Sequence, residues 1–249
     1  MKTIAVIPAR MGSSRFPGKP IAQLLGRPML EHVYKRVALS KTLDATYIAT
    51  CDEEIRRIAE AFGANVIMTA DTHERASDRV AEAVTHIDAE LIVMVQGDEP
   101  MTHPDMIDTA VAPFHNDPQL ECVNLVRKID NEKDYRDVNT IKVVMNRQGD
   151  AIYMSRQPIP TMAKTGFAQT SAYKQVCIIP FRRAALFQYT NLPPTPLEEL
   201  ESVDMMRLLE HGYRVKMVNT EFNTQAVDTE ADLARVAKLM ENDPLLARY

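Results

Sequence analysis

A basic, glycine-rich stretch near the N-terminus has the residue types that bind phosphate. Residues 8–20 read PARMGSSRFPGKP and place three cations within ten residues, separated by small residues whose backbone N–H groups can turn toward an anion at little steric cost. These residues are Arg10, Gly12, Ser13, Ser14, Arg15, Gly18 and Lys19. The stretch predicts a polyphosphate site, and the simpler alternative is a solvated basic loop.

The stretch matches neither of two common nucleotide-binding motifs. A Walker loop requires a hydroxyl residue after its lysine, and here Pro20 follows Lys19. The stretch also lacks the spacing Gly-x-Gly-x-x-Gly, so a dinucleotide-binding fold is the weaker alternative.

One aspartate has the position of a metal ligand. Asp98 follows the apolar run 91–95, and an acid at the carboxyl end of a buried strand is well placed to hold a hard cation. Mg²⁺ is the usual companion of a nucleoside triphosphate. The alternative is a turn or helix-capping aspartate. A second acid, Asp228, precedes Thr229 and the amphipathic segment 230–240, and by itself it indicates only a helix cap.

The composition indicates a soluble protein that folds as one large α/β body of 249 residues, with 45% hydrophobic and 25% charged residues. A net charge of −5 gives no general attraction to nucleic acid or to an anionic membrane. Neither a signal peptide nor a membrane span is indicated, so the cytoplasm is the expected location. Cys51, Cys122 and Cys177 are too widely spaced for a zinc motif and predict reduced thiols.

Strands and helices alternate in the first part of the chain. The hydrophobic pattern predicts strands at 3–7, 47–50, 65–68 and 91–95, and helices at 28–39, 53–62, 77–87, with Ser77 as N-cap, and 104–113. Such alternation indicates a parallel sheet with helices on both faces, whose functional loops follow the carboxyl ends of the strands.

The alternation of strands and helices ends in the second part of the chain, where the pattern predicts a mixed, partly antiparallel sheet. Strands are expected at 123–126, 140–145, 151–154, 175–181 and 214–218, the first three without intervening helices, and a turn at 146–149 joins two of them. Helices are expected at 183–189, 197–211 and 230–240, and a mobile loop at 157–172.

Five stretches together resemble the CMP-Kdo synthetases (3-deoxy-manno-octulosonate cytidylyltransferases), a family of sugar-activating nucleotidyltransferases. They are Arg-x-x-Ser-x-Arg-x-Pro-Gly-Lys-Pro at 10–20, Val-Gln-Gly-Asp-Glu-Pro at 95–100, Ile-Lys-Val-Val at 141–144, Ile-Tyr-x-Ser-Arg at 152–156 and Val-Asp-Thr-x-x-Asp-Leu at 227–233. The resemblance implies a Rossmann-like (GT-A-like) nucleotidyltransferase domain. Within it, residues 1–115 would be the nucleotide-binding half, and 116–249 the acceptor-binding and dimerisation half.

The resemblance also implies a reaction and the residues that perform it. The anomeric hydroxyl of a Kdo-like sugar acid would attack the α-phosphorus of CTP, with Mg²⁺ as cofactor, and pyrophosphate would leave. Lys19, Asp98 and Asp228 are the implied catalytic residues, and the two aspartates the implied metal ligands. The implied nucleotide contacts are Pro8, Ala9, Arg10, Gly12, Ser13, Ser14, Arg15, Lys19, Ser77, Arg79, Gln96 and Gly97. The implied acceptor contacts are Gln96, Lys142, Arg156, Gln175, Ile179, Asp204 and Met205, and the fork of Arg156 suits a carboxylate.

Three segments depart from the family pattern. The family's His-Leu-Gly-Ile-Tyr-Gly-Tyr-Arg reads Gln-Val-Cys-Ile-Ile-Pro-Phe-Arg at 175–182, and its Leu-Glu-Gln-Leu-Arg reads Val-Asp-Met-Met-Arg at 203–207. The loop expected near the cytidine, Ser-Gly-Thr-Glu-Arg in the family, reads Arg-Ala-Ser-Asp-Arg at 75–79. Because buried hydrogen-bonding groups decide which hydroxyls a site accepts, these changes leave open a different acid acceptor.

Three alternatives therefore remain beside a Kdo cytidylyltransferase that serves a surface glycan such as lipopolysaccharide. One is a cytidylyltransferase for another acid, the second a nucleotide-binding homologue without turnover. The third and weakest is a glycosyltransferase, for which Gly97-Asp98-Glu99 lacks the usual Asp-x-Asp motif. The expected partners are CTP, a small sugar acid and a second copy of the chain, and no nucleic acid.

Overall fold

The structure is a computed structural model that describes residues 1–12, 15–162 and 166–249. It divides the chain into two compact units. Unit 1 comprises residues 1–108 and 223–249, and unit 2 comprises residues 109–222. The sequence placed this boundary near residue 115 and assigned all later residues to the second half, whereas segment 223–249 belongs with the N-terminal residues.

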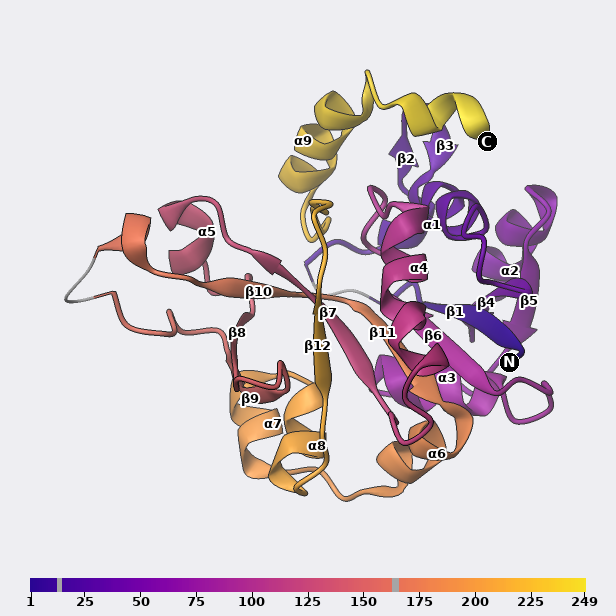
Figure 1. The fold of residues 1–249 in the computed structure, drawn as a ribbon. Coiled ribbons are helices and arrows are strands. Elements are labelled where there is room, and N and C mark those ends of the chain that lie inside the picture. The colour runs from indigo at the N-terminus through magenta and orange to yellow at the C-terminus, as the bar shows by residue number, and fades with distance from the viewer. Residues whose placement is uncertain (13–14, 163–165) are drawn as a thin grey trace. The chain divides into compact units, whose positions relative to one another are not determined.

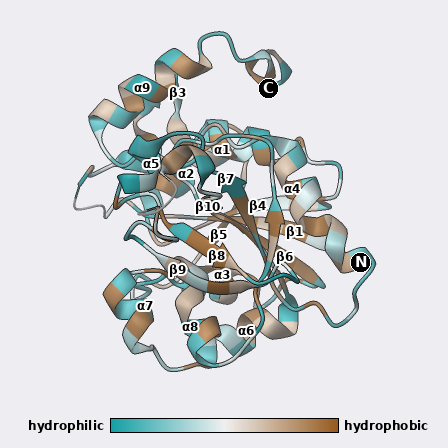
Figure 2. Ribbon diagram, turned by 60° about the vertical axis from the view of Figure 1, so that its left-hand side comes forward, coloured by the Kyte–Doolittle hydropathy of each residue, from teal (hydrophilic) through white to brown (hydrophobic). Residues whose placement is uncertain are grey.

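Unit 1 contains a parallel sheet in which the strands follow the order β6-β1-β4-β5 (Figure 1). The strands are β1 (Thr3–Ala9), β4 (Ala45–Thr50), β5 (Asn65–Met68) and β6 (Leu91–Val95). Every residue of β1 and β6 is buried, and Figure 2 colours these strands mostly brown for their hydrophobic residues. Such continuous burial is typical of parallel strands covered on both faces.

Besides short 3-10 helices, unit 1 contains a short hairpin and several α-helices. They are β2 (Gln23–Leu24), β3 (Arg27–Pro28), α1 (Met29–Val37), α2 (Glu53–Ala61), α3 (Ala76–Ala83) and α9 (Glu230–Met240), and α4 (Pro104–Val111) crosses the unit boundary. Because β1, β4 and β6 run parallel, the residues that follow them gather at one edge of the sheet.

Unit 2 contains a mixed sheet with the order β12-β7-β10-β8-β9. Strand β12 runs parallel to β7, and the other neighbours are antiparallel. The strands of this sheet are β7 (Val123–Lys128), β8 (Lys142–Met145), β9 (Ala151–Ser155), β10 (Tyr173–Val176) and β12 (Lys216–Asn219), and unit 2 also contains strand β11 (Ile178–Arg182), which is not part of this sheet. Its helices are α5 (Glu132–Arg136), α6 (Arg183–Asn191), α7 (Pro196–Glu201) and α8 (Met205–Glu210).

The predicted α/β class, the alternation in the first part and the mixed sheet in the second are confirmed. Strands β5 and β6 and helix α9 have the predicted bounds. The three cysteines have free thiols, as expected. Within the described residues, no helix is long and apolar enough to cross a membrane.

Four local predictions are wrong for identifiable reasons. Helix α5 lies between β7 and β8, where none was expected, and its N-cap is Asn131, whose side chain accepts a hydrogen bond from Asp134 N. The helix expected at 197–211 is broken because Ser202 adopts a left-handed conformation with φ of 51°. The strand expected at 175–181 is divided at Cys177 into β10 and β11. Ser77 is not an N-cap, because α3 already begins at Ala76. In the loop predicted at 157–172, residues 167–169 form a short 3-10 helix.

Candidate functional site

Three predicted catalytic side chains meet within unit 1. The ammonium of Lys19 lies 2.8 Å from Asp98 Oδ2 and 3.3 Å from Asp228 Oδ1, so one cation bridges the two carboxylates. Arg15 adds a second cation, 3.1 Å from Asp228 Oδ1. The side chains of Lys19, Asp98 and Asp228 are 14%, 29% and 27% exposed, so the cluster is partly shielded yet open to a ligand.

Asp98 is positioned by the end of β6 and by a close approach to β1. A Cβ atom on Gly97 would stand 3.0 Å from the carbonyl oxygen of Pro8 and 3.4 Å from Ile7. Only glycine therefore fits beside β1 without a shift of the backbone. On the other side of Asp98, the buried carboxylate of Glu99 accepts a 2.6 Å hydrogen bond from the hydroxyl of Thr224.

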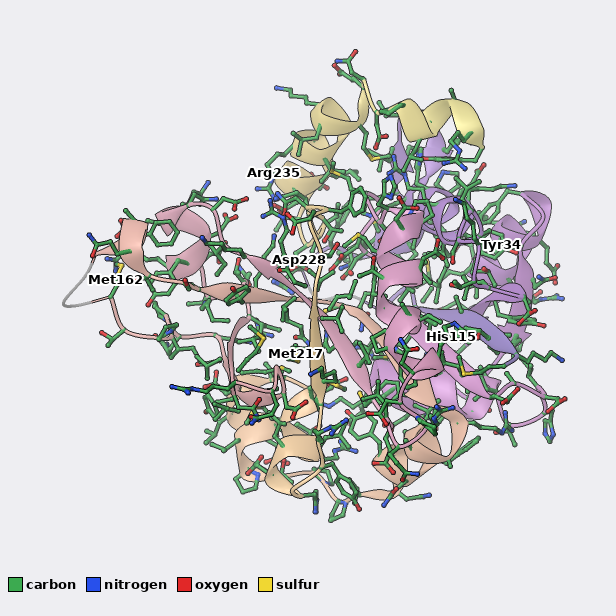
Figure 3. The ribbon with its side chains drawn as sticks, in the orientation of Figure 1. Tyr34, His115, Met162, Met217, Asp228 and Arg235 are labelled. Atoms are coloured by element: carbon green, nitrogen blue, oxygen red, sulfur yellow. The ribbon has the colours of Figure 1, made fainter. Side chains whose placement is uncertain are left out.

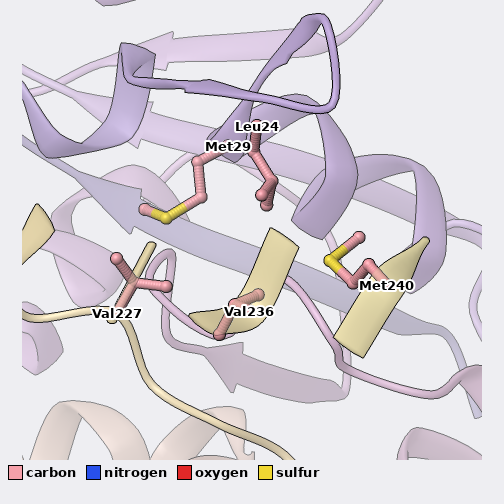
Figure 4. Packing of buried hydrophobic residues seen from close by; sticks show 5 residues of the cluster. All are labelled: Leu24, Met29, Val227, Val236 and Met240. Carbon is pink, nitrogen blue, oxygen red and sulfur yellow. The ribbon is translucent and has the colours of Figure 1, made fainter. Parts of the chain in front are cut away.

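Asp228 is brought to Asp98 by the segment that returns to unit 1. Val227 N donates a 2.9 Å hydrogen bond to the carbonyl oxygen of Asp98, which joins the two aspartate-bearing segments directly. The side chain of Val227 packs into a buried cluster with Leu24, Met29, Val236 and Met240 (Figure 4).

Helix α9 fixes the other side of Asp228, which Figure 3 labels at the approach to this helix. Thr229 is the N-cap, and a reciprocal capping box joins it to Asp232. Asp228 N also donates to Asp232 Oδ2, at 3.2 Å. The capping motif read from the sequence is thus confirmed, and it coexists with the convergence of Asp228 on Lys19.

The basic loop leaves β1 beside these aspartates. Pro8 and Ala9 are buried within β1, whereas Arg10 and Gly12 are exposed. Gly18 N bonds to Met11 O at 3.2 Å and closes the loop, and the left-handed φ of 72° at Gly18 begins the 3-10 helix that carries Lys19. Ser13 and Ser14, both expected phosphate contacts, lie outside the described residues.

The predicted contacts on α3 are buried. Ser77 Oγ is fully buried and has no hydrogen-bond partner among the described residues, so it is a group that a ligand could satisfy. Arg79 instead donates to Thr69 Oγ1 at 2.5 Å and to Ala70 O at 3.2 Å. Gln96, the remaining expected contact, is half-buried between β6 and Gly97.

The Asp98–Asp228 pair fits a hard divalent cation. Both residues offer carboxylate oxygens, the ligands that Mg²⁺ prefers, and both already converge on a positive charge. The described residues contain no group of three or more histidine, cysteine or acidic side chains suited to a metal. A cation held here would therefore complete its coordination with water or phosphate oxygens.

In unit 2, the two cations predicted to face an acceptor are bonded to backbone carbonyls. Lys142 is fully buried, and its ammonium donates to the carbonyl oxygens of Asp137, Thr140 and Arg156. Burial lowers the pKa of Lys142 to about 8. The guanidinium of Arg156 donates to the carbonyls of Glu201 (2.7 Å), Val138 (3.1 Å) and Ser202 (3.1 Å).

The sheet of unit 2 separates Lys142 from Gln175. Lys174 pairs with Lys142, and Gln175 is the next residue along β10. Because successive side chains alternate between the faces of a sheet, Gln175 and Lys142 point to opposite faces. Gln175 is half-buried, and its Nε2 lies 2.6 Å from Oδ1 of the buried residue Asn124.

The other predicted acceptor residues occupy varied positions in unit 2. Ile179 is buried in β11, at 3% exposure, and Met205 is fully buried in α8. Asp204 is half-buried at the N-terminus of α8, where its carbonyl accepts a hydrogen bond from Tyr189 Oη at 3.0 Å. Their contacts with an acceptor stay predictions.

Several supporting residues escaped the sequence analysis. Thr224 and Glu99 clamp the two aspartate segments, Asn124 holds Gln175, and Glu201 accepts hydrogen bonds from Tyr153, Ser155 and the backbone N–H of Arg156. Glu99 belongs to the stretch at 95–100 that resembles the family, so the sequence offered a signal for this residue. The partners of the others are distant in the chain, and no local pattern identifies them.

Residues 4–236 match the family described as cytidylyltransferase. Two curated relatives carry the name 3-deoxy-manno-octulosonate cytidylyltransferase. The one from Geobacter metallireducens is 41% identical over 249 residues, covering 96% of this chain and 97% of the relative. The one from Solibacter usitatus is 43% identical over 240 residues, covering 96% of this chain and 95% of the relative.

Solved structures show the same similarity. A CMP:2-keto-3-deoxy-manno-octonic acid synthetase complexed with CTP aligns with a TM-score of 0.90 and 36% identity, covering 96% of this chain and 98% of that one. A cytidylyltransferase from Leptospira borgpetersenii aligns with a TM-score of 0.66 at 18% identity, covering 96% of this chain and 87% of that one, which shows a shared fold.

Proposed function

Because this chain belongs to the cytidylyltransferase family, we propose that it transfers the cytidylyl group of CTP to 3-deoxy-manno-octulosonate (Kdo) and releases pyrophosphate. The observation that carries the proposal is the convergence of Lys19, Asp98 and Asp228 within unit 1. The names of the curated relatives and of the CTP-bound structural neighbour support the choice of both substrates.

The charges of the site suit the cleavage of a triphosphate. Lys19 and Arg15 would stabilise the negative charge that grows on the departing pyrophosphate, and backbone N–H groups of the glycine-containing loop would orient it. The hydroxyl of Ser77, which has no partner among the residues that the structure describes, would bond the nucleoside portion. No protein nucleophile is needed, because the hydroxyl of the acceptor attacks the α-phosphorus itself.

We extend the proposal to Mg²⁺ held by Asp98 and Asp228. Their two carboxylates provide the oxygen ligands for one ion, and the bound ion would supply charge neutralisation at the α-phosphate and a lower pKa for the attacking hydroxyl. Val227 and Thr224 keep the two carboxylates together through their bonds to Asp98 and Glu99.

The second candidate is the same transfer to a different sugar acid. It is favoured by the contacts of Gln175, whose amide is bonded to Asn124, and by the burial of Ile179. Both residues differ from the family pattern, so the hydrogen bonds offered to an acceptor differ as well. The contacts of Arg156 are compatible with either acid.

Pyrophosphate release tests the proposal directly. The purified protein is incubated with CTP, Mg²⁺ and Kdo, in parallel with related ulosonic and phosphorylated acids, and Asp98→Asn serves as control because it removes a ligand charge at nearly constant volume. Release with Kdo that is lost in the folded variant is the expected result. Release only with another acid selects the second candidate, and CTP binding without release for any acid would indicate a homologue without turnover.

We also propose that the protein is a cytoplasmic homodimer, serving a surface glycan such as lipopolysaccharide. These points rest on the resemblance and the composition described above. Sedimentation equilibrium across a tenfold concentration range tests the dimer, and a single species of 28.1 kDa, the mass of one chain, would contradict it.

A further inference from the structure

We infer that Asn124 is a positioning residue that fixes the amide of Gln175, so that Gln175 presents its carbonyl oxygen Oε1 to a hydroxyl group of the acceptor. The inference rests on the proposed function and assigns a donor group to the substrate at this point. Both residues belong to the sheet of unit 2.

The orientation of the Asn124 amide follows from its surroundings. Its Nδ2 lies 3.0 Å from the carbonyl oxygen of Leu125 and 2.7 Å from that of Val176. Carbonyl oxygens only accept hydrogen bonds, so the atom that faces them must be the nitrogen. An inverted amide would place an oxygen against two acceptors in a fully buried position, which is costly.

The orientation of Gln175 follows in turn. Because Asn124 Nδ2 is committed to the two carbonyls, Oδ1 faces Gln175, and the Gln175 atom 2.6 Å away must be a donor, Nε2. The opposite end of the amide is then Oε1, to which none of the described residues donates a hydrogen bond. Register supports the pairing, since Gln175 stands opposite Val126, and Asn124 lies on the same face two residues earlier along β7.

The consequence is a rule for the acceptor. With the amide held in this orientation, Oε1 can accept a hydrogen bond but cannot turn an N–H group toward the substrate. It therefore favours a hydroxyl or amine at the neighbouring position of the substrate and disfavours a group that has no proton to donate. A freely rotating glutamine would make no such distinction, because it could turn its N–H toward an acceptor. Specificity at this point thus comes from a buried asparagine that need not touch the substrate.

The test compares sugar acids that differ in one hydroxyl. The wild-type protein is assayed with Kdo and with analogues in which one hydroxyl at a time is replaced by fluorine, which can accept a hydrogen bond but not donate one. For one analogue we expect a kcat/KM about tenfold lower than for Kdo. Gln175→Met keeps the length of the side chain but removes its amide. In this variant the kcat/KM for Kdo should fall about tenfold, to the value of that analogue in the wild type, while the KM for CTP stays constant.

Asn124→Ala separates positioning from a merely structural role. If the amide of Gln175 is released, the penalty for that fluorinated analogue shrinks from about tenfold to about twofold, which general loss of structure would not produce. Equal penalties in wild type and Asn124→Ala, or no fluorine-sensitive hydroxyl in an active wild type, would overturn the inference.

An activity-independent measurement distinguishes this inference from the proposed function. In ¹⁵N-labelled protein, the Gln175 side-chain amide should show slowed proton exchange and a shifted resonance that moves to solvent-like values in Asn124→Ala. If the Gln175 amide protons of the wild type exchange as fast as those of a solvent-exposed glutamine, the hydrogen bond to Asn124 is refuted, even if Kdo is turned over. A protected amide in a protein inactive with every acid would instead refute the proposed function and leave the orientation standing.

Discussion

Replacing Lys19 by methionine should change metal binding and nucleotide binding in opposite directions. The substitution removes the ammonium that bridges Asp98 and Asp228 and keeps the apolar stem of the side chain. Without CTP, Mg²⁺ and the ammonium compete for the same carboxylate oxygens, so we expect the variant to bind the metal alone more tightly. With CTP, the loss of a phosphate-facing cation should weaken nucleotide binding and turnover.

The magnitude follows from the partial burial of the cluster. A fully exposed ion pair contributes at most about 1 kcal/mol. A hydrogen bond to a charged group contributes about 1.5–3 kcal/mol. Because the three side chains are between 14% and 29% exposed, we take about 1.5 kcal/mol for the competition, which corresponds to about tenfold tighter metal binding.

Isothermal titration with Mg²⁺ in the absence of nucleotide, repeated with CTP, measures both effects. Lys238→Met is the matched control, because it removes one positive charge from the exposed side of α9 and changes the net charge of the protein equally. Unchanged or weaker metal binding in Lys19→Met, with Lys238→Met like wild type, would show that the ammonium does not occupy the metal position.

Three further substitutions test other parts of the structure. Thr224→Val should lower the free energy of unfolding by about 1.5–3 kcal/mol and weaken Mg²⁺ binding, because Glu99 loses a buried hydrogen bond; chemical denaturation and titration measure both, with Thr224→Ser as control. Asp98→Asn should lower kcat at least about a hundredfold without unfolding, as pyrophosphate release and circular dichroism would show. Lys142→Met tests how stability depends on pH. The pKa of Lys142 is about 8 in the folded protein, below its ordinary value of 10.5, because burial destabilises the charged form of the side chain. Wild-type stability should therefore rise from pH 8 toward 10.5 relative to the variant, and equal denaturation midpoints across that range would contradict this.

The sequence could predict the features that depend on local pattern. Hydrophobic periodicity located strand β5 and the buried strand β6, and the capping motif at Thr229 placed the start of α9. The resemblance supplied the pairing of Asp98 with Asp228, which no spacing between them reveals. The structure adds that Lys19 bonds to both.

The rest depends on contacts between residues that are far apart in the chain. The Thr224–Glu99 hydrogen bond spans 125 positions, and a threonine in an irregular segment carries no signal of its partner. The resemblance implied that Lys142 faces an acceptor, and the structure adds that its ammonium bonds to three backbone carbonyls, which the sequence did not indicate. The break between α7 and α8 arises from one left-handed residue, Ser202, for which helical periodicity gives no warning.

The charged cluster and the amide pair belong to different units of the chain. Unit 2 is inserted between residues 108 and 223, and unit 1 is completed by the segment that follows the insertion. Lys19, Asp98 and Asp228 are therefore held together by contacts inside unit 1, including the bond from Val227 to Asp98. The amide pair of Asn124 and Gln175 belongs to unit 2, and its hydrogen bond is made within that unit. Substitutions in this pair should accordingly alter the choice of acceptor and leave metal binding in the absence of acceptor as it is.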